Sequence, residues 1–343
     1  MKRTFLCVFL SLAVMGMLVS VSHAQQKPTT YNWRLQATHI TGDPPFQWMF
    51  PRLVQKLDEL SNGRIKLTCF PGGALVPVPE TLNMLGKGVY EMASSVGAYW
   101  QGLIPAAGLE FGFPGSWHST PEQMVLFHDK GMTDILRQAY AEHGVRYLSV
   151  YHIEPFCIES TVKVKNLNDL RKLKVRSIGV PTLLLNKLGV KTATIAWAEL
   201  YMAMKLRTVD ACTVGLYYWY QGKIPEIAKY VLWPPLYDPS SGNILMNLKT
   251  WTELPPDIKQ IVNYAVDDAV WYMYRMLQEQ FDFMYDKLKK EYGVEFITLP
   301  PEDQAEIKKA ARELWPELAA KDKYSAQIMK IIEDYSRFKG HTK

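Results

Sequence analysis

Apolar and polar residues follow two repeating patterns in the first part of the chain. Residues 33–38 and 64–70 carry apolar side chains at every second position, which predicts two short strands. Between them, a stretch beginning at Phe46 repeats apolar residues three and four positions apart and stops at residues 61–63, Ser-Asn-Gly, as an amphipathic helix does. A strand, a helix and a strand in this order predict a parallel pair with a right-handed crossover.

The same alternation of strands and helices continues in both halves of the chain. Further strands are expected at residues 90–95, 145–151, 158–164, 174–177 and 208–213, and helices at 81–86, 121–140, 166–173, 181–188 and 198–207. The chain has 343 residues, and a single core tends to split beyond about 250–300 residues. We therefore predict an α/β fold of two similar lobes.

A long helix is expected near the C-terminus. Residues 255–292 have helical composition without an internal proline or glycine, far beyond the usual three or four turns. Such a helix is longer than one lobe needs, so we expect it to span both. One or two amphipathic helices should follow within residues 301–338. The predicted division is a signal peptide at 1–24, lobe I at 25–150 plus 238–265, and lobe II at 151–237 plus 266–343.

The N-terminus has the pattern of a secretory signal. Lys2 and Arg3 precede an apolar run over residues 5–21, and Ser22-His23-Ala24 offers small residues at the two positions that a signal peptidase reads. We expect cleavage after Ala24 and a periplasmic location. No later stretch reaches the roughly 18 apolar residues that a membrane helix needs.

Composition and motifs exclude several classes of function. Removing the signal peptide lowers the formal net charge of +5 by two. The net charge that remains is too small to indicate a nucleic-acid-binding protein. Cys69, Cys157 and Cys212 form no C-x-x-C pair, which argues against zinc and leaves at most one disulfide. The chain has no Gly-x-Ser-x-Gly, His-Glu-x-x-His or phosphate-binding loop, so we expect no enzyme and no cofactor.

The segment 166–177 is the strongest candidate for ligand binding. Its leucines recur three residues apart, Asn166 or Asn168 can cap a short helix, and a strand then ends at Arg176. A guanidinium at a strand end beside Gly179 can grip a carboxylate with two parallel hydrogen bonds. The alternative is a surface arginine paired with a neighbouring acid.

Aromatic residues and one histidine accompany this arginine. Tyr99 and Trp100 follow the strand at 90–95, at the edge where open α/β sheets bind ligands, although packing between lobes is an alternative. His39 lies in the first strand–helix loop and should face the cleft. Residues 217–220, Tyr-Tyr-Trp-Tyr, add aromatic surface, with helix core packing as the alternative reading.

The ordered set of motifs resembles the solute-binding proteins of TRAP transporters (tripartite ATP-independent periplasmic transporters), the DctP-type family. The motifs are Phe-Pro-Gly-Gly-Ala-Leu at 70–75, Gly-Val-Tyr-Glu-Met-Ala at 88–93, Asn-Leu-Asn-Asp-Leu at 166–170, Leu-Lys-Val-Arg at 173–176, Glu-Leu-Tyr-Met-Ala at 199–203, Val-Asp-Ala at 209–211 and the long helix after Leu254-Pro255. The resemblance implies a two-lobed, type II-like periplasmic binding protein that closes over an organic acid and delivers it to a small and a large membrane subunit.

The resemblance also implies roles for particular residues. Arg176 would form the salt bridge to the substrate carboxylate. Tyr99 and Trp100 match the aromatic pair of the branch that binds 2-oxo and 2-hydroxy monocarboxylates. Asp238, in the Trp-Pro-Pro-Leu-Tyr-Asp-Pro segment at 233–239, matches the acidic metal ligand of that branch.

Departures from that branch argue against a bound metal. Thr213 replaces its glutamate and Val214 its tryptophan, and residues 153–156, which include Glu154 and Phe156, replace a loop bearing Asn and Gln. Too few oxygens remain for a calcium-like ion, which takes six to eight. The pocket should therefore be metal-free, roomier and more apolar, and suited to a bulky or aromatic monocarboxylate.

The candidate binding residues are Arg176, Tyr99, Trp100, His39, Glu154, Phe156, Thr213, Val214, Tyr217 and Asp238. The leading hypothesis is a transport binding protein. A secreted hydrolase or lyase would use Glu154 and Asp238 as an acid–base pair around Arg176. A ligand sensor that docks on a receptor would share the pocket and differ only in its partner.

Overall fold

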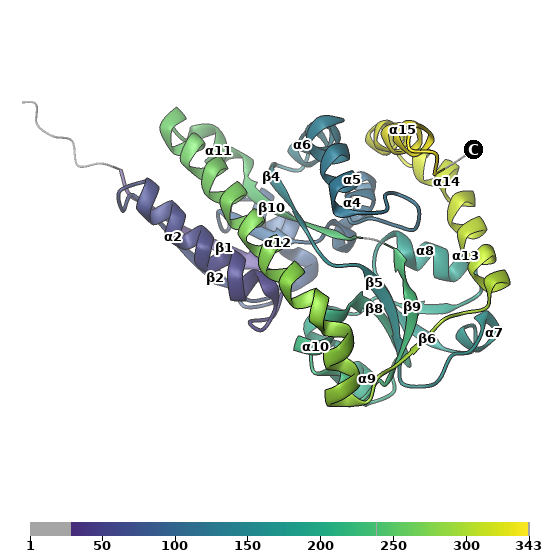
Figure 1. Ribbon diagram of the computed structural model, residues 1–343. Coiled ribbons are helices and arrows are strands. Elements are labelled where there is room, and N and C mark those ends of the chain that lie inside the picture. The colour runs from purple at the N-terminus through teal and green to yellow at the C-terminus, as the bar shows by residue number, and fades with distance from the viewer. Residues whose placement is uncertain (1–28, 238, 342–343) are drawn as a thin grey trace, which may run out of the picture.

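A computed structural model describes residues 29–237 and 239–341 (Figure 1). The expected signal peptide and candidate residue Asp238 lie outside these ranges. The described residues form two mixed β-sheets surrounded by helices, which confirms the predicted α/β class.

The first sheet has the strand order β2-β1-β3-β10-β4. Its strands are β1 (Tyr31–Ala37), β2 (Ile65–Phe70), β3 (Met92–Ser95), β4 (Val145–His152) and β10 (Ser241–Asn247). Strands β1 and β2 pair in parallel, as their strand–helix–strand pattern predicts. Strand β10 runs antiparallel between β3 and β4 and was not predicted. All seven of its residues are buried, so it shows no alternation of polar and apolar positions.

The second sheet has the order β11-β9-β5-β8-β6-β7. Its strands are β5 (Phe156–Ser160), β6 (Lys174–Arg176), β7 (Lys191–Ala193), β8 (Ala211–Gly215), β9 (Tyr230–Tyr237) and β11 (Glu295–Ile297). The predictions at 158–164 and 208–213 are displaced from β5 and β8 by two to four residues at their ends, because every position of both strands is buried and the pattern does not mark where they stop. Strands β7, β9 and β11 were not predicted.

Helices cover both sheets. The first group comprises η1 (Pro45–Met49), α2 (Phe50–Leu60), η2 (Val78–Glu80), α3 (Thr81–Gly86), η3 (Gly97–Trp100), α4 (Pro105–Glu110), α5 (Thr120–Met124), η4 (Val125–Asp129) and α6 (Met132–Ala141). The second comprises α7 (Leu167–Leu170), α8 (Val180–Lys187), η5 (Trp197–Glu199), α9 (Leu200–Lys205), α10 (Leu216–Gln221), η6 (Ile224–Glu226), α11 (Leu248–Glu253), α12 (Pro256–Tyr292), α13 (Pro301–Glu313), α14 (Trp315–Ala319) and α15 (Lys323–Phe338).

Two helical predictions need correction. The helix expected at 121–140 is interrupted at Gly131, whose φ of +89° takes the backbone out of the helical region. The segment 301–338 forms three helices rather than one or two, with Pro316 in the first turn of the middle one. Within the described ranges, no helix combines the length and the apolar character that crossing a bilayer requires.

The long helix α12 connects the two halves of the molecule (Figure 1). It packs against strand β4 of the first sheet and the neighbouring helix α2, and against α10 in the other half, as expected of a helix that spans both lobes. The expected boundaries put residues 266–343 in lobe II, yet α15 packs against α4 and α6, which the same boundaries assign to lobe I. The division into lobes at those boundaries stays a proposal.

A buried carboxyl group connects several elements around the first sheet. Glu110 of α4 is fully buried, and its Oε1 accepts hydrogen bonds from Tyr140 Oη (3.1 Å) and Asn243 Nδ2. Trp100 Nε1 donates to the same tyrosine oxygen at 2.8 Å. Gly97 makes room for the carboxyl group, since a Cβ there would lie 2.4 Å from Oε1. One side chain thereby links η3, α4, α6 and β10.

This burial predicts a pH-dependent stability. Burial raises the pKa of Glu110 from 4.5 to about 8, against the opposing hydrogen bonds, so the native state holds a proton that the unfolded chain releases between these values. The stabilisation is complete below pH 4.5 and is lost as the pH rises to about 8. Glu110→Gln, which stays neutral, should reduce this loss by up to about 1.4 kcal/mol per pH unit.

Urea unfolding of both proteins at several pH values between about 5 and 8 measures the difference. Asp43 and Glu154 also have pKa values raised by burial and remain in the variant. The substitution should therefore remove only part of the dependence of the unfolding free energy on pH. Parallel stability curves for wild type and Glu110→Gln would show that Glu110 is not protonated in the native state.

Candidate functional site

A small cavity of about 40 Å³ lies where the edges of the two sheets meet. From the first sheet's side, Thr38 and His39 follow β1, Val96 follows β3 and Ile153 follows β4. The complete lining is Thr38, His39, Val96, Tyr99, Phe111, Ile153, Phe156, Arg176, Ile178, Trp197, Val214 and Tyr218. The carboxyl ends of parallel strands are the usual ligand-binding edge of an α/β sheet.

Arg176 is the only charged side chain in this lining among the described residues. It is 2% exposed. Its Nε donates to the carbonyl of Ile195 at 3.0 Å, and Nη1 donates to the carbonyl of Thr213 at 3.3 Å. No carboxylate in the described part of the chain forms an ion pair with it, so the alternative of a surface arginine paired with an acid is wrong. A buried charge without a counter-charge is costly and favours an anion as ligand.

Local chain geometry fixes the direction of this guanidinium. Asn166 caps α7, as predicted, by accepting a hydrogen bond from the Asp169 amide at 2.9 Å. Strand β6 then lies between β7 and β8 in parallel pairing, and Arg176 is its last residue. Gly179 has a φ of +70° and begins the turn into α8, and a Cβ at this position would lie 3.0 Å from that of Ala98.

Aromatic side chains form most of the remaining wall. Phe111 and Phe156 meet edge to face with ring centroids 5.3 Å apart, and Trp197 and Tyr218 do so at 6.3 Å. The Trp197 amide donates to the Tyr99 hydroxyl at 3.3 Å. Because Tyr99 lies beyond β3 and Trp197 beyond β7, this hydrogen bond joins the two halves of the molecule across the cavity.

His39 contributes a polar but uncharged surface. Burial lowers its pKa to about 3, so the ring is neutral at physiological pH. Its Nε2 lies 3.2 Å from Tyr151 Oη, which itself donates to the Ser95 carbonyl at 3.0 Å. The Tyr151 hydroxyl proton is donated to the Ser95 carbonyl, so His39 Nε2 is the donor and Tyr151 Oη the acceptor of the hydrogen bond between them. His39 Nδ1 is then a buried acceptor without a partner among the described residues.

Glu154 lies beside the cavity and has a structural contact of its own. Its two carboxyl oxygens accept hydrogen bonds from the backbone amides of Tyr217 (2.8 and 2.9 Å) and Tyr218 (3.0 Å) at the start of α10. Gly215 leaves room for it, since a Cβ there would lie 2.2 Å from Glu154 Cγ. Burial raises the pKa of this carboxyl to about 8, although the two amides oppose the shift.

Three further candidates lie next to the cavity without lining it. Trp100 points into the Glu110 network described above. Thr213 donates through Oγ1 to Ser177 Oγ at 3.2 Å and orients Arg176 through its carbonyl. Tyr217 packs on Trp48 with centroids 5.4 Å apart and donates to Gln47 at 2.9 Å. The structure therefore brings together Arg176, His39, Tyr99, Phe156 and Val214, and Asp238 lies outside the described residues.

Several wall residues were not predicted from the sequence. Tyr218 belongs to the aromatic run at 217–220, whose neighbour Tyr217 was chosen instead. Trp197 follows β7, a strand too short to be found from its pattern. Phe111 follows a six-residue helix, and no local pattern connects it with Arg176.

The expected roomier pocket is not present in this conformation. A volume of about 40 Å³ is well below the roughly 300 Å³ at which ligand pockets usually begin. The lining is strongly apolar, as the replacement of a tryptophan by Val214 suggested. Aromatic side chains from both halves pack around Arg176, which is buried.

The described donors do not suit a metal ion. No lining residue in the described ranges is Asp or Glu, and Glu154 directs its oxygens at backbone amides. Elsewhere in the described chain, no three His, Cys, Asp or Glu side chains gather closely enough to hold a metal. A calcium-like ion, which requires six to eight oxygens, does not fit this set.

Comparisons with known proteins agree with this architecture. The chain is 24% identical over 305 residues to a monocarboxylate 2-oxoacid-binding periplasmic protein of Nostoc sp., a match that covers 84% of this chain and 78% of that protein. Two crystal structures of TRAP periplasmic solute-binding proteins are similar. The one from Pseudoalteromonas atlantica, with bound sodium and pyruvate, has a TM-score of 0.84 and 25% identity and covers 91% of this chain and 96% of its own.

The other, from Bordetella bronchiseptica, has calcium and picolinate in one of its sites. Its TM-score is also 0.84, at 21% identity, with 92% of this chain and 95% of that chain covered. The two-lobed fold implied by the sequence resemblance is thereby confirmed. The family model for DctP, described as bacterial extracellular solute-binding protein, family 7, matches residues 41–322. The match spans most of the chain, and the protein belongs to this family of solute-binding receptors of TRAP transporters.

Proposed function

We propose that the protein captures an organic monocarboxylate in the periplasm and delivers it to the small and large membrane subunits of a TRAP transporter. The observation that carries this proposal is the buried Arg176 guanidinium, which has no acidic partner among the described residues. A ligand carboxylate would supply the missing charge.

The guanidinium retains enough donors for a two-point contact. Arginine has five N–H groups, and backbone carbonyls occupy one on Nε and one on Nη1. The other three, including both on Nη2, have no partner in the described part of the chain. Two of them match the two oxygens of a carboxylate in the parallel geometry that makes such pairs strong.

The walls favour a single negative charge and an apolar body. His39 is neutral, so a second carboxylate would find no second cation among the described lining residues. Five aromatic side chains surround the arginine: Tyr99, Phe111, Phe156, Trp197 and Tyr218. The Nostoc relative is named for 2-oxo monocarboxylates, and the Pseudoalteromonas protein holds pyruvate. We infer a related acid with a bulkier, aromatic side chain.

Ligand capture requires the halves to separate and close again. The hydrogen bond between the Trp197 amide and the Tyr99 hydroxyl joins them in the present conformation, in which the cavity holds only about 40 Å³. A carboxylate that binds the closed form more tightly than the open form shifts the population toward closure. The membrane subunits would then distinguish the loaded receptor by its closed shape.

The hydrolase or lyase alternative receives no support from the site. Its proposed acid, Glu154, is bound to the amides of Tyr217 and Tyr218 and does not line the cavity. A ligand sensor would use the same pocket and differ only in its partner.

The first prediction concerns Arg176. Arg176→Ala should weaken carboxylate binding by about 2–5 kcal/mol, because the ligand charge is left buried without a partner. Arg176→Lys should recover only part of the loss, since an ammonium cannot make the two parallel bonds. Isothermal titration with pyruvate, phenylpyruvate and picolinate measures both effects.

Arg171→Ala is the matched control, since this half-buried arginine pairs with Glu306 and does not line the cavity, and its loss should leave affinity unchanged. Melting curves of the ligand-free variants separate binding from folding. Arg176→Ala removes a buried charge but also leaves the carbonyls of Ile195 and Thr213 without their donor, so its melting curve has to show that the variant is folded at the titration temperature. Wild-type affinity in that variant would refute the role proposed for Arg176.

The second prediction concerns metal ions. Because the described donors do not suit calcium, dialysis against a chelator should leave the affinity for the acid unchanged. Titration before and after dialysis, with calcium and sodium added back separately, is the measurement. A large loss that either ion restores would show that a metal takes part, with Asp238 as the first ligand to examine.

A further inference from the structure

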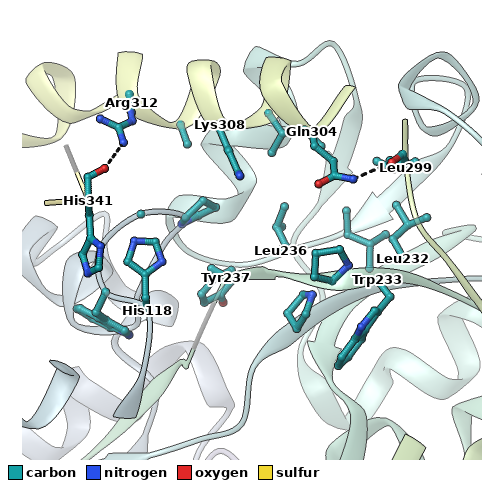
Figure 2. Close-up of a pocket in the computed structure, with 18 of the residues that line it drawn as sticks. His118, Leu232, Trp233, Leu236, Tyr237, Leu299, Gln304, Lys308, Arg312 and His341 are labelled. Carbon is teal, nitrogen blue, oxygen red and sulfur yellow. Dashed lines mark hydrogen bonds between the residues drawn. The ribbon is translucent and has the colours of Figure 1, made fainter. Parts of the chain in front are cut away.

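A second and much larger cavity of about 420 Å³ lies between β9 and the C-terminal helices (Figure 2). Its volume falls in the range of roughly 300–1,000 Å³ that is typical of small-molecule sites. The lining is Pro114, Gly115, Trp117, His118, Ile158, Leu232, Trp233, Pro234, Pro235, Leu236, Tyr237, Leu299, Gln304, Ile307, Lys308, Ala311, Arg312, Trp315, Ser336 and His341. We call it the β9–α13 cavity. It shares no lining residue with the cavity at Arg176.

One side of the β9–α13 cavity is apolar. Strand β9 supplies six consecutive residues, 232–237, with the sequence Leu-Trp-Pro-Pro-Leu-Tyr. Helix α13 faces it with Ile307 and Ala311, and the buried ring of Trp315 follows at the start of α14. A surface of proline, leucine and tryptophan side chains suits a flat or branched hydrocarbon body.

The polar part of the lining is entirely basic or neutral. His118, Lys308, Arg312 and His341 are its ionisable groups apart from Tyr237, and no described lining residue is Asp or Glu. Figure 2 shows Lys308 pointing from α13 into the cavity. Lys308 has no ion pair with any described residue. A deep apolar surface under an unpaired ammonium is complementary to an amphipathic anion.

The other basic groups already have contacts that position them. Arg312 Nη2 donates to the His341 carbonyl at 2.7 Å, and the rings of His341 and His118 meet with centroids 4.2 Å apart. Glu122, the acid of this region, is held by His341 Nε2 at 3.0 Å and Lys339 Nζ at 3.5 Å. Burial, together with the positive charges of His341, Lys308 and Arg312, lowers the pKa of His118, although Glu122 opposes the shift. The cavity mouth is thus electropositive.

Two of the lining residues also carry buried polar atoms. The Trp315 indole nitrogen and the Ser336 hydroxyl have no hydrogen-bond partner among the described residues. Unpaired buried polar groups are unusual in folded proteins, and a bound ligand or water often accounts for them.

We propose that the β9–α13 cavity is a second binding site, for an organic anion with a ring-bearing apolar body. The carboxylate lies at Lys308 and Arg312, and the body lies against Trp233, Pro234 and Leu236. The site is independent of the capture function proposed for Arg176. Tyr237 separates the two cavities, because it lines one and packs against Phe156 of the other with centroids 5.4 Å apart.

The test uses 2-naphthoate as the probe, with binding followed by isothermal titration and by quenching of tryptophan fluorescence. The mature full-length chain carrying Arg176→Ala serves as the background, so that the Arg176 site contributes as little as it can. In this background 2-naphthoate should bind at one site per chain. Adding Lys308→Gln and Arg312→Gln should weaken it by roughly tenfold or more, because two charge-assisted hydrogen bonds are lost.

Lys309→Gln is the control for the lysine substitution, since it removes one positive charge from the exposed neighbour of Lys308 on α13, which does not line the cavity, and it should leave affinity unchanged. A third variant, Ala311→Phe, fills the cavity from its wall and should also prevent binding while the α13 charges remain. The proposal is overturned if 2-naphthoate fails to bind at millimolar concentration, or if Lys308→Gln/Arg312→Gln binds as tightly as Lys309→Gln. Binding that Arg176→Ala abolishes completely would assign the probe to the other cavity and overturn it too.

Discussion

The burial of one positive charge without an acidic partner organises the centre of this molecule. Arg176 is held by the carbonyls of Ile195 and Thr213, and the described residues offer it no carboxylate. Its surroundings are aromatic rings and a neutral histidine, which solvate a cation poorly. A protein can retain so costly an arrangement when a ligand completes it. The buried positive charge of Arg176, which no described carboxylate neutralises, is therefore the strongest argument for a carboxylate receptor.

Four fully buried acids among the described residues could have neutralised a cation, and none forms an ion pair with Arg176. One of them, Glu159 of β5, accepts a hydrogen bond from Cys212 Sγ at 3.7 Å. Glu154 binds the first amides of α10, Glu110 joins α4, α6 and β10, and Asp43 accepts a hydrogen bond from the Ile40 amide at 3.0 Å. Burial raises the pKa of Glu154, Glu110 and Asp43 to about 8 and that of Glu159 well above its usual value, so these groups favour the neutral acid near pH 7. They fix elements around the cavity without competing with a ligand anion. The long helix α12 adds a common support by packing against β4 in one half and α10 in the other.

The sequence was informative wherever local patterns determine structure. Alternation and helical spacing predicted the β1–α2–β2 unit, and the cap at Asn166 led to the strand that ends at Arg176. Strands β9 and β10 were missed because pairing with distant strands, rather than alternation, defines them. The same reason explains Phe111 and Trp197, which reach the cavity only through tertiary packing. Trp100 differs from its neighbour Tyr99 because a helical turn directs it toward Tyr140, a contact that adjacency in sequence cannot reveal.

The most direct test of the role of Arg176 compares a carboxylic acid with its own carboxamide. A thermal-shift screen over pyruvate, phenylpyruvate, picolinate and related acids first selects the acid that stabilises the protein most. Isothermal titration of that acid and of its amide then isolates the charge, because the two molecules have nearly the same shape. The amide should bind more weakly by roughly a hundredfold or more, because only the acid neutralises Arg176. Equal affinity for acid and amide would contradict this role of Arg176.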